Sequence, residues 1–257
     1  MRLIDSHAHL FFDWFDEDRQ EVLDRAREEG VTAFVHVGTD LASSRKVREV
    51  ARQLEHSFPT VGVHPHDSAT LDDETWAAVA EEAAFDDVVG VGETGLDFFK
   101  NYAPADVQIA AFRRHVALAR DLEKPLVIHC RDAFSETAAI LREFAPIRGV
   151  MHCFTGDAET AEAFLGLGLH ISFAAQVTYP KKTEAIQEAA RQVPLDRMLV
   201  ETDCPFLPPQ PFRGKRNEPS YLVHTVRRIA ELRSIAPEAV AEQTARNTIE
   251  LFRLPID

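Results

Sequence analysis

A His-x-His pair near the start of the chain is the strongest local indication of chemistry. His7 and His9 flank Ala8 in a β-rich run, and side chains two positions apart on a strand point to the same side of it. Two imidazoles in this arrangement converge on one point, as the ligands of a metal ion do. A chance pair would have the same local sequence, so the metal interpretation depends on partners elsewhere in the chain.

Four more groups of ligand type close later β-rich runs. Each is expected at the end of a short apolar strand: Glu93, His129, His152 and Asp203. A residue with a purely structural role could occupy any position along a strand, so this shared position favours a metal site over chance. Four imidazoles and two carboxylates exceed the needs of one tetrahedral ion with an open position, and they suit two ions about 3.5 to 4 Å apart.

The expected cofactor is therefore a pair of divalent metal ions bridged by Glu93. The other ligands divide into one set for each ion: His7, His9 and Asp203 for the first, and His129 and His152 for the second. Imidazoles favour zinc, manganese, iron, cobalt or nickel, although metal availability can override ligand preference and admit magnesium. Such ions would provide hydroxide near neutral pH and polarise a carbonyl or phosphoryl group. Asp203 is the expected proton acceptor, which makes Asp203 and Glu93 the expected catalytic residues.

Eight β-rich runs must hold these groups. Helical patterns separate the runs, which cover residues 3–9, 33–38, 60–64, 88–93, 125–129, 149–152, 170–173 and 198–203. Strand followed by helix, eight times, predicts an α/β fold, a (β/α)8 TIM barrel, whose chemistry lies at the carboxyl ends of the strands. Final helical patterns at residues 221–233 and 237–252 predict an additional C-terminal helix. The 257 residues suit one barrel of about 250 residues, so a single domain is expected over residues 1–257.

Composition limits the remaining classes. The formal net charge of −14 argues against electrostatic capture of nucleic acid over the whole surface, but metal ions and a few clustered cations would still attract a polyanion locally. No stretch approaches the ~18 unbroken apolar residues of a membrane span, and the N-terminal residues lack the pattern of a secretory signal, so we expect a cytoplasmic protein without a membrane partner. The cysteines each follow a candidate ligand and are expected to point outward from the barrel as small buried residues: Cys130, Cys153 and Cys204.

Residues near the ligands are expected to orient them or to contact a substrate. Asp5 and Glu201 each stand two positions before a ligand, so they share the inward face of a strand and are expected to hydrogen-bond the ligands. His64, in the sequence Gly-Val-His-Pro-His, ends the third run and is expected to contact substrate or a metal-bound water. His66 in the same sequence is expected to be structural or exposed.

Basic and aromatic residues provide candidates for binding an anionic substrate. The proline-rich stretch 204–219 carries three cations that either contact phosphate or pair with nearby carboxylates: Arg213, Lys215 and Arg216. Arg131, two positions beyond His129, is a further candidate for an anion contact. Three aromatic residues after Glu93 either stack on bases or pack at the barrel rim: Phe98, Phe99 and Tyr102.

Several motifs in order resemble the TatD family of metal-dependent deoxyribonucleases, within the amidohydrolase superfamily. The resemblance covers essentially the whole chain. It rests on Ile4-Asp5-Ser6-His7-Ala8-His9, Gly62-Val63-His64-Pro65-His66, Gly90-Val91-Gly92-Glu93-Thr94-Gly95-Leu96-Asp97, His152-Cys153-Phe154-Thr155-Gly156, Glu201-Thr202-Asp203-Cys204-Pro205 and Arg213-Gly214-Lys215-Arg216-Asn217-Glu218-Pro219.

This resemblance implies a phosphodiesterase that acts on DNA, commonly as a 3'-5' exonuclease. It implies as metal ligands the six residues already singled out, which are His7, His9, Glu93, His129, His152 and Asp203. Many superfamily relatives bridge their ions with a modified lysine, whereas this chain offers Glu93, which favours the nuclease family over the amide-cleaving branches. We therefore predict a dinuclear hydrolase that cleaves DNA phosphodiester bonds by metal-bound hydroxide, with single-stranded DNA ends as its substrate.

Two alternatives stay open at this stage. The same metal chemistry would serve a small-molecule amidohydrolase or esterase, and activity on such compounds without any on DNA would decide for it. A non-catalytic nucleic-acid-binding or scaffold protein would keep the barrel for interaction alone. DNA affinity that survives chelation and loss of the ligands would indicate that class.

Overall fold

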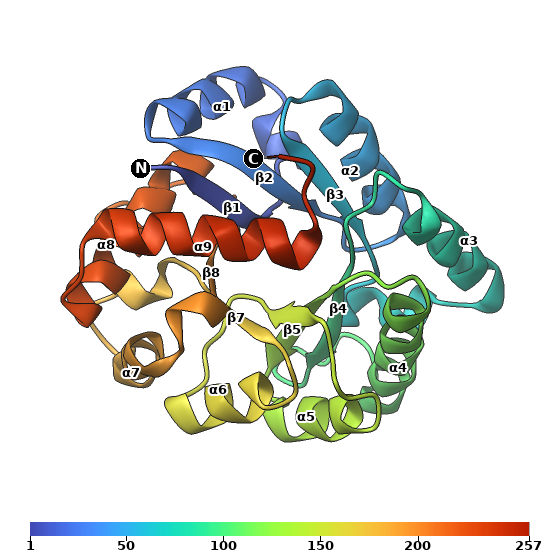
Figure 1. The fold of residues 1–257 in the computed structure, drawn as a ribbon. Helices are drawn as coiled ribbons and strands as arrows, with labels where there is room; N and C mark the ends of the chain where they lie inside the picture. The colour runs from blue at the N-terminus through green and yellow to red at the C-terminus, as the bar shows by residue number, and fades with distance from the viewer. Residues whose placement is uncertain (257) are drawn as a thin grey trace.

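The computed structural model describes residues 1–256, and within them eight parallel strands follow one another around a barrel in sequence order (Figure 1). The bridge between Ala8 and Cys204 joins the end of the first strand to the segment after the last. This architecture confirms the predicted (β/α)8 barrel. The strands are β1 (Leu3–Ala8), β2 (Val31–Val37), β3 (Ser57–Val61), β4 (Gly90–Asp97), β5 (Leu126–Arg131), β6 (Gly149–Met151), β7 (His170–Phe173) and β8 (Met198–Val200).

Helices surround the strands on the outside of the barrel (Figure 1). They are α1 (Arg19–Glu28), α2 (Leu41–Gln53), α3 (Asp73–Ala84), α4 (Ala105–Asp121), α5 (Phe134–Arg142), α6 (Ala158–Leu165), α7 (Glu184–Gln192), α8 (Leu222–Arg233) and α9 (Pro237–Phe252). Short 3-10 turns interrupt the loops at η1 (Asp13–Phe15), η2 (Pro65–Thr70), η3 (Ala175–Thr178), η4 (Leu195–Arg197) and η5 (Pro219–Tyr221). None of the helices within residues 1–256 is long and apolar enough to span a bilayer.

Local sequence explains where several helices begin. Asp40 accepts a hydrogen bond from the backbone of Ser43, whose side chain in turn accepts from the backbone of Asp40, and this reciprocal cap starts α2. The side chain of Asp157 accepts a hydrogen bond from the backbone N–H of Thr160 and so caps α6. Pro237 occupies the first turn of α9, where its missing N–H leaves no intrahelical bond unmade.

The barrel interior is a narrow apolar core that α9 closes at one end. Valines and a leucine from alternate positions of the strands fill it, together with the last turn of α9 and the residues after it: Val35, Val37, Val127, Val150, Leu199, Leu251, Phe252 and Leu254. In Figure 1, α9 lies across the barrel on the side facing the viewer. This end is packed, so an opening for a substrate must lie at the opposite, carboxyl end of the strands.

The fourth strand differs from the expectation that it ends at Glu93. β4 continues to Asp97, and a register shift against β5 falls between Val91 and Thr94. Gly92 and Gly95 have φ of +142°, and a Cβ on either would come within 2.4 Å or 1.9 Å of a β5 carbonyl oxygen. Only glycine allows this approach. The prediction that Glu93 terminates its strand is therefore wrong, because Gly92 and Gly95 allow close pairing with β5 to continue past it.

The eighth strand is shorter than expected. β8 ends at Val200 rather than at residue 203, and Asp203 has φ of +57° in the left-handed region. Asp203 is therefore carried by a turn beyond the strand.

A buried histidine in β2 makes stability depend on pH. His36 shares the outward face of its strand with Phe34 and has no exposed surface. Neither ring nitrogen has a hydrogen-bond partner within the part of the chain that the structure describes. Burial lowers the pKa of His36 from 6.5 to about 3. Below pH 6.5, His36 therefore binds a proton in the unfolded chain but not in the folded protein. Its contribution to stability is lost progressively as the pH falls below 6.5.

We expect His36→Leu to stabilise the protein at acid pH relative to wild type. Between pH 8 and pH 5 the difference in free energy of unfolding should grow by about 2 kcal/mol in favour of the variant, because the proton uptake on unfolding is removed. Urea unfolding at the two pH values, with a chelator present throughout, measures it. His56→Asn, at an exposed histidine, should keep the wild-type pH dependence, and an equal effect of His36→Leu at both pH values would contradict the argument.

Candidate metal centre

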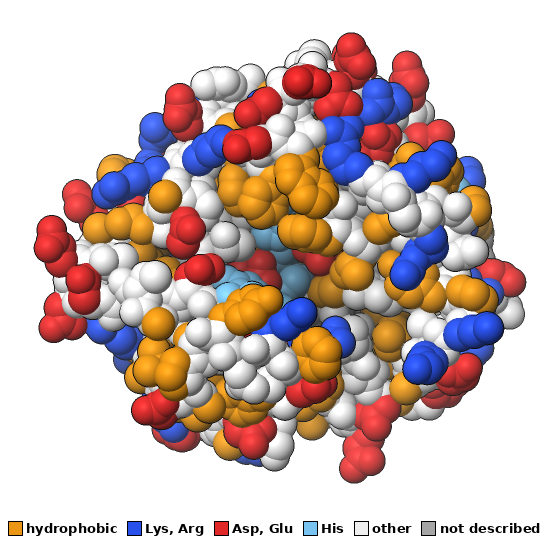
Figure 2. All heavy atoms as spheres, turned by 180° about the vertical axis from the view of Figure 1, so that it is seen from behind, with side chains coloured by type: hydrophobic (Ala, Val, Ile, Leu, Met, Phe, Trp, Pro, Cys, Tyr) orange, Lys and Arg blue, Asp and Glu red, His pale blue; other side chains and the backbone are white. Residues whose placement is uncertain are grey.

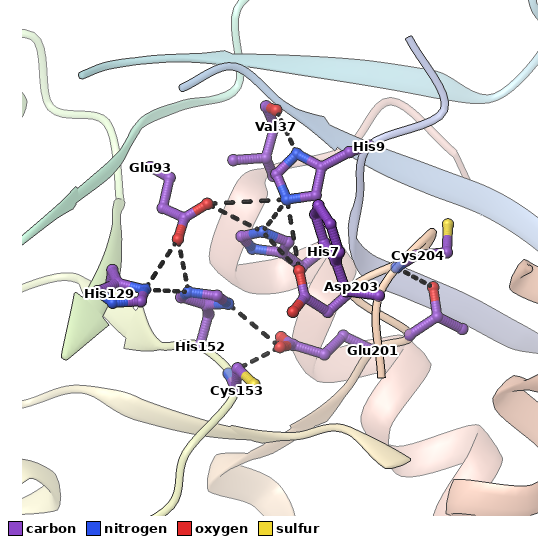
Figure 3. Close-up of polar contacts among 12 residues, drawn as sticks. His7, His9, Val37, Glu93, His129, His152, Cys153, Glu201, Asp203 and Cys204 are labelled. Carbon is purple, nitrogen blue, oxygen red and sulfur yellow. Dashed lines mark hydrogen bonds and ion pairs between the residues drawn. The ribbon is translucent and has the colours of Figure 1, made fainter. Parts of the chain in front are cut away.

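Six side chains of ligand type meet at the carboxyl end of the barrel (Figure 3). His7 lies in β1 with His9 just beyond it, Glu93 in β4, His129 in β5, His152 just after β6 and Asp203 after β8. Five of the six line a cavity of about 390 Å³, and His7 lies fully buried beside them. Figure 2 shows the histidines at the bottom of a hollow on this face of the molecule. The structure thus brings all six predicted ligands together.

Glu93 contacts two separate sets of imidazoles with its two oxygens. Its Oε2 lies 3.3 Å from His7 Nε2, which is itself 3.1 Å from His9 Nε2. Its Oε1 lies 2.9 Å from His152 Nε2 and 3.1 Å from His129 Nδ1. Asp203 Oδ1 completes the first set at 3.4 Å from His9 Nε2. One carboxylate therefore stands between two clusters of ligand atoms.

Three of the histidines are oriented by acceptors outside the clusters. His9 Nδ1 lies 2.9 Å from the carbonyl oxygen of Val37. His152 Nδ1 lies 3.3 Å from Glu201 Oε1, and His129 Nε2 lies 3.2 Å from Asp97 Oδ2. A neutral ring that donates outward carries its lone pair on the other nitrogen, which here faces the interior of the site.

This arrangement fits divalent metal ions. His129 Nδ1 and His152 Nε2 lie 3.4 Å apart beside the same carboxylate oxygen. Two nitrogen atoms whose lone pairs face each other repel unless a cation or a proton lies between them. Nitrogen and carboxylate donors suit zinc and its neighbours in the periodic table. The residues present are therefore positioned to bind metal.

The electrostatics of the site couple its carboxylates to its imidazoles. Burial opposes the ionisation of Glu93, but His152, His64 and His129 hold its pKa well below the usual value. Burial likewise opposes a charge on His152, yet Glu93 and Glu201 raise its pKa well above the usual value. Protons on the imidazoles and divalent cations therefore compete for the same carboxylates.

Known proteins match this chain along nearly its full length. The family model described as TatD related DNase matches residues 4–253. The uncharacterized metal-dependent hydrolase YabD of Bacillus subtilis is 40% identical over 254 residues, which cover 98% of this chain and 99% of that protein. The 3'-5' ssDNA/RNA exonuclease TatD of Erwinia billingiae is 36% identical over 260 residues, covering 98% and 100%. The crystal structure of the TatD homologue YJJV from Escherichia coli K12 matches with a TM-score of 0.93 at 28% identity, covering 99% of both chains.

The chain belongs to the TatD family. This membership confirms the predicted enzyme class, a metal-dependent hydrolase of the TatD nuclease type. It also confirms the resemblance that the sequence motifs carried.

Two buried carboxylates fix the polypeptide around the candidate ligands. Asp5 accepts hydrogen bonds from the backbone N–H of His7 and of Thr202, at 3.3 and 3.0 Å, and so ties β1 to the turn that carries Asp203. Burial raises the pKa of Asp5 to about 7. Glu201 accepts from the backbone N–H of Cys153 at 2.7 Å in addition to His152. Both residues lie where they would orient ligands.

Asp97 is a carboxylate beside the candidate ligands to which the sequence analysis assigned no role. Its Oδ2 lies 3.2 Å from His129 Nε2 and 2.9 Å from His66 Nε2, while its Oδ1 accepts two backbone N–H groups after β4. Asp97 lies four positions after Glu93 in the same strand, so regular alternation places both side chains on the inward face. The expected end of the strand at Glu93 hid this.

The structure places His64 and Arg131 at the cavity. His64 Nε2 lies 3.5 Å from Glu93 Oε1, and its side chain is 12% exposed. Arg131 lines the same cavity, and its guanidinium carbon lies 4.8 Å from the centre of the Phe99 ring. His66, expected to be structural or exposed, also lines the cavity. Cys153 lines it as well, so the expectation that this cysteine points outward is wrong, because its φ of +46° turns the chain.

The three cations of the proline-rich stretch are engaged elsewhere within residues 1–256. Arg216 forms two hydrogen bonds with Asp18, at 2.5 and 2.9 Å. The guanidinium of Arg213 lies 4.1 Å from the centre of the Tyr179 ring, and the ammonium of Lys215 lies 5.7 Å from that of Phe212. The structure does not bring these three side chains into the wall of the cavity described above.

We expect Asp97→Asn to weaken metal binding at the His129 side of the site. The variant no longer offers a carboxylate to His129 Nε2–H, and loss of such an outer partner typically lowers metal affinity about 10- to 100-fold. Titration of the metal-free protein with Zn²⁺ or Mn²⁺ against a competing chelator measures the affinity. Asp67→Asn, at another carboxylate of the cavity wall, is the matched control. Equal affinities of Asp97→Asn and wild type would remove Asp97 from the site.

Proposed function

We propose that this TatD protein is a dinuclear divalent-metal hydrolase that cleaves phosphodiester bonds of DNA, as a 3'-5' exonuclease acting on single-stranded ends. The observation that carries the proposal is Glu93, whose two oxygens face two different sets of imidazole nitrogens. A carboxylate in this position suits a bridge between two ions. The relative from Erwinia billingiae, named a 3'-5' ssDNA/RNA exonuclease, supports the substrate class.

The metal ligands divide as the contacts suggest. One ion would be held by His7, His9, Glu93 and Asp203, and the other by Glu93, His129 and His152. Bound divalent ions would lower the pKa of water toward neutrality and polarise a phosphoryl oxygen. The identity of the ions is restricted by the donors to zinc, manganese, iron, cobalt, nickel or, through availability, magnesium.

The side chains around the ligands would then perform binding and proton transfer. Asp203 makes its ligand-side contacts through Oδ1, which leaves Oδ2 to accept a proton from the attacking water. Arg131 and His64 line the cavity. Arg131 ends β5 and His64 follows β3, and these strands flank β4 across the barrel from β8 and Asp203. There they would hold the non-bridging oxygens of a phosphodiester. Asp203 and Glu93 remain the proposed catalytic residues, and His64 and Arg131 the proposed substrate contacts.

We expect wild-type protein to shorten end-labelled single-stranded DNA stepwise from its 3' end in the presence of Mn²⁺ or Mg²⁺, and not in excess chelator. Glu93→Gln should abolish the activity and reduce bound metal, because one shared ligand serves both ions, while circular dichroism stays unchanged. Metal content is measured by elemental analysis of the same preparations. Hydrolysis of small amides or esters without any cleavage of DNA or RNA, in a protein that contains two metals, would replace this function with that of a small-molecule hydrolase.

We expect Arg131→Ala to raise KM for a single-stranded oligonucleotide and to reduce the slope of log(kcat/KM) against log[salt] by about one, because one phosphate contact is lost. Arg216→Ala should leave this slope unchanged, since Asp18 already neutralises Arg216. Kinetics over a salt series compare the two. A reduced slope in Arg216→Ala with an unchanged one in Arg131→Ala would reverse the assignment and restore the proline-rich stretch as the phosphate contact.

A further inference from the structure

Exposed aromatic side chains are concentrated at the mouth of the metal site. Within residues 1–256, the large apolar side chains that are exposed are Met1, Trp14, Phe85, Phe99, Tyr102, Phe206 and Ile235. Four of these seven belong to loops that follow β1, β4 and β8 at the carboxyl end of the barrel. Single exposed apolar residues are ordinary, whereas a cluster at a cavity indicates a ligand. In Figure 2, hydrophobic side chains border the hollow that contains the histidines.

On one side of the mouth, aromatic rings rise from a metal ligand to the surface. The ring of His9 lies 5.5 Å from that of Phe12 and 6.2 Å from that of Phe206. Phe206 in turn lies 6.0 Å from Trp14. Trp14 is 60% exposed and Phe206 43% exposed, so the outer end of this wall presents ring faces and edges to solvent.

A second group of rings rises on the other side. The ring of His66 lies 6.3 Å from that of His129 and 4.7 Å from that of Tyr102. Phe99 lies beside Arg131, and Tyr102 and Phe99 are 68% and 56% exposed. In a barrel whose strands follow sequence order, β4 and β5 are diametrically opposite β8 and β1. The two groups therefore flank the metal site from opposite sides.

In each group, hydrogen bonds anchor the backbone that carries one of the rings. Arg216 donates to the carbonyl oxygen of Trp14 and is fixed by Asp18, which anchors η1. The backbone N–H of Phe99 donates to Asp97 Oδ1 at 3.0 Å. Ordered rings lose little conformational freedom on binding, so they serve as preformed stacking surfaces.

We propose that the pair Trp14 and Phe206 and the pair Phe99 and Tyr102 are two stacking platforms for unpaired nucleobases, one on each side of the scissile phosphate. This inference rests on the proposed function and names how its substrate is selected. Aromatic side chains stack on any base, because every base has a π-face, and this requires bases that are free of a complementary strand. The platforms therefore select single-stranded ends without regard to base sequence, and an acidic surface does not oppose this apolar contact.

The test combines platform variants with substrates that lack one base. On a single-stranded oligonucleotide, Trp14→Ala and Tyr102→Ala should each lower kcat/KM roughly 5- to 150-fold, as alanine substitution of a stacking residue does. The decrease in kcat/KM caused by Trp14→Ala should disappear when the nucleotide on one side of the scissile bond is replaced by an abasic site. The decrease caused by Tyr102→Ala should disappear when the abasic site is on the other side. Phe85→Ala is the matched control, since Phe85 is 43% exposed like Phe206 but lies beside Arg48 away from the mouth.

Two further measurements separate this inference from the proposed function. Hydrolysis of methyl p-nitrophenyl phosphate, a phosphodiester without a base, should be equal in wild type and all platform variants. In Trp76→Phe, which leaves Trp14 as the one remaining tryptophan of the two, a single-stranded oligonucleotide in excess chelator should quench indole emission more strongly than a duplex does. This binding readout reports the platform even if the protein cleaves no DNA. Absence of quenching, or equal losses on intact and abasic substrates, would overturn the platforms while leaving a cleaving wild type with its proposed function.

Discussion

A buried carboxylate surrounded by imidazoles is the constraint around which the site is built. Glu93 is 4% exposed, and nitrogen atoms of His7, His64, His129 and His152 lie within 3.5 Å of its oxygens. An isolated carboxylate in such a position would cost several kcal/mol in lost hydration, which only close positive charge or hydrogen bonding offsets. Each of these histidines lies at or near the end of a different strand. Closure of the barrel therefore brings their nitrogen atoms close to the Glu93 carboxylate.

The glycines of β4 also allow β5, which carries His129, to lie close to β4. Side chains at Gly92 and Gly95 would meet the carbonyl oxygens of Val127 and His129, and β5 would have to move outward with its ligand. The same strand then reaches past His129 to Asp97, which accepts from the outer nitrogen of that ring. One strand thus supplies the shared carboxylate, the room for the neighbouring ligand and the acceptor that sets its tautomer. This explains why a segment rich in glycine, which usually weakens a strand, lies at the centre of the fold.

Periodicity along strands was enough to find side chains that the fold brings together as candidate ligands, because a period of two relates residue type directly to the face of the sheet. It located the barrel, the convergence of His7 with His9 and the position of Glu201 beside His152. It failed where a strand end was misplaced or where the backbone leaves the extended conformation. Ending the fourth strand at Glu93 concealed Asp97, which lies four positions further along the same face. The left-handed φ of Cys153 directs toward the cavity a residue that was expected to face outward. It also could not place Arg216, whose partner Asp18 lies 198 positions away in the sequence.

The pairing of surface charges shapes how a polyanion can be bound by a chain with net charge −14. Arg216 is paired with Asp18 and Arg25 with Glu218, so these two cations are already neutralised by their own surroundings. At physiological salt, charges more than about 8 Å apart are largely screened, so these pairs contribute little attraction at a distance. Two divalent ions would bring four positive charges against the two carboxylates Glu93 and Asp203, inside a cavity where screening is weak. Under the proposed function, attraction for phosphate would thereby be confined to the metal site. Recognition of the rest of a substrate would depend on short-range contacts, of which the apolar ones are insensitive to salt.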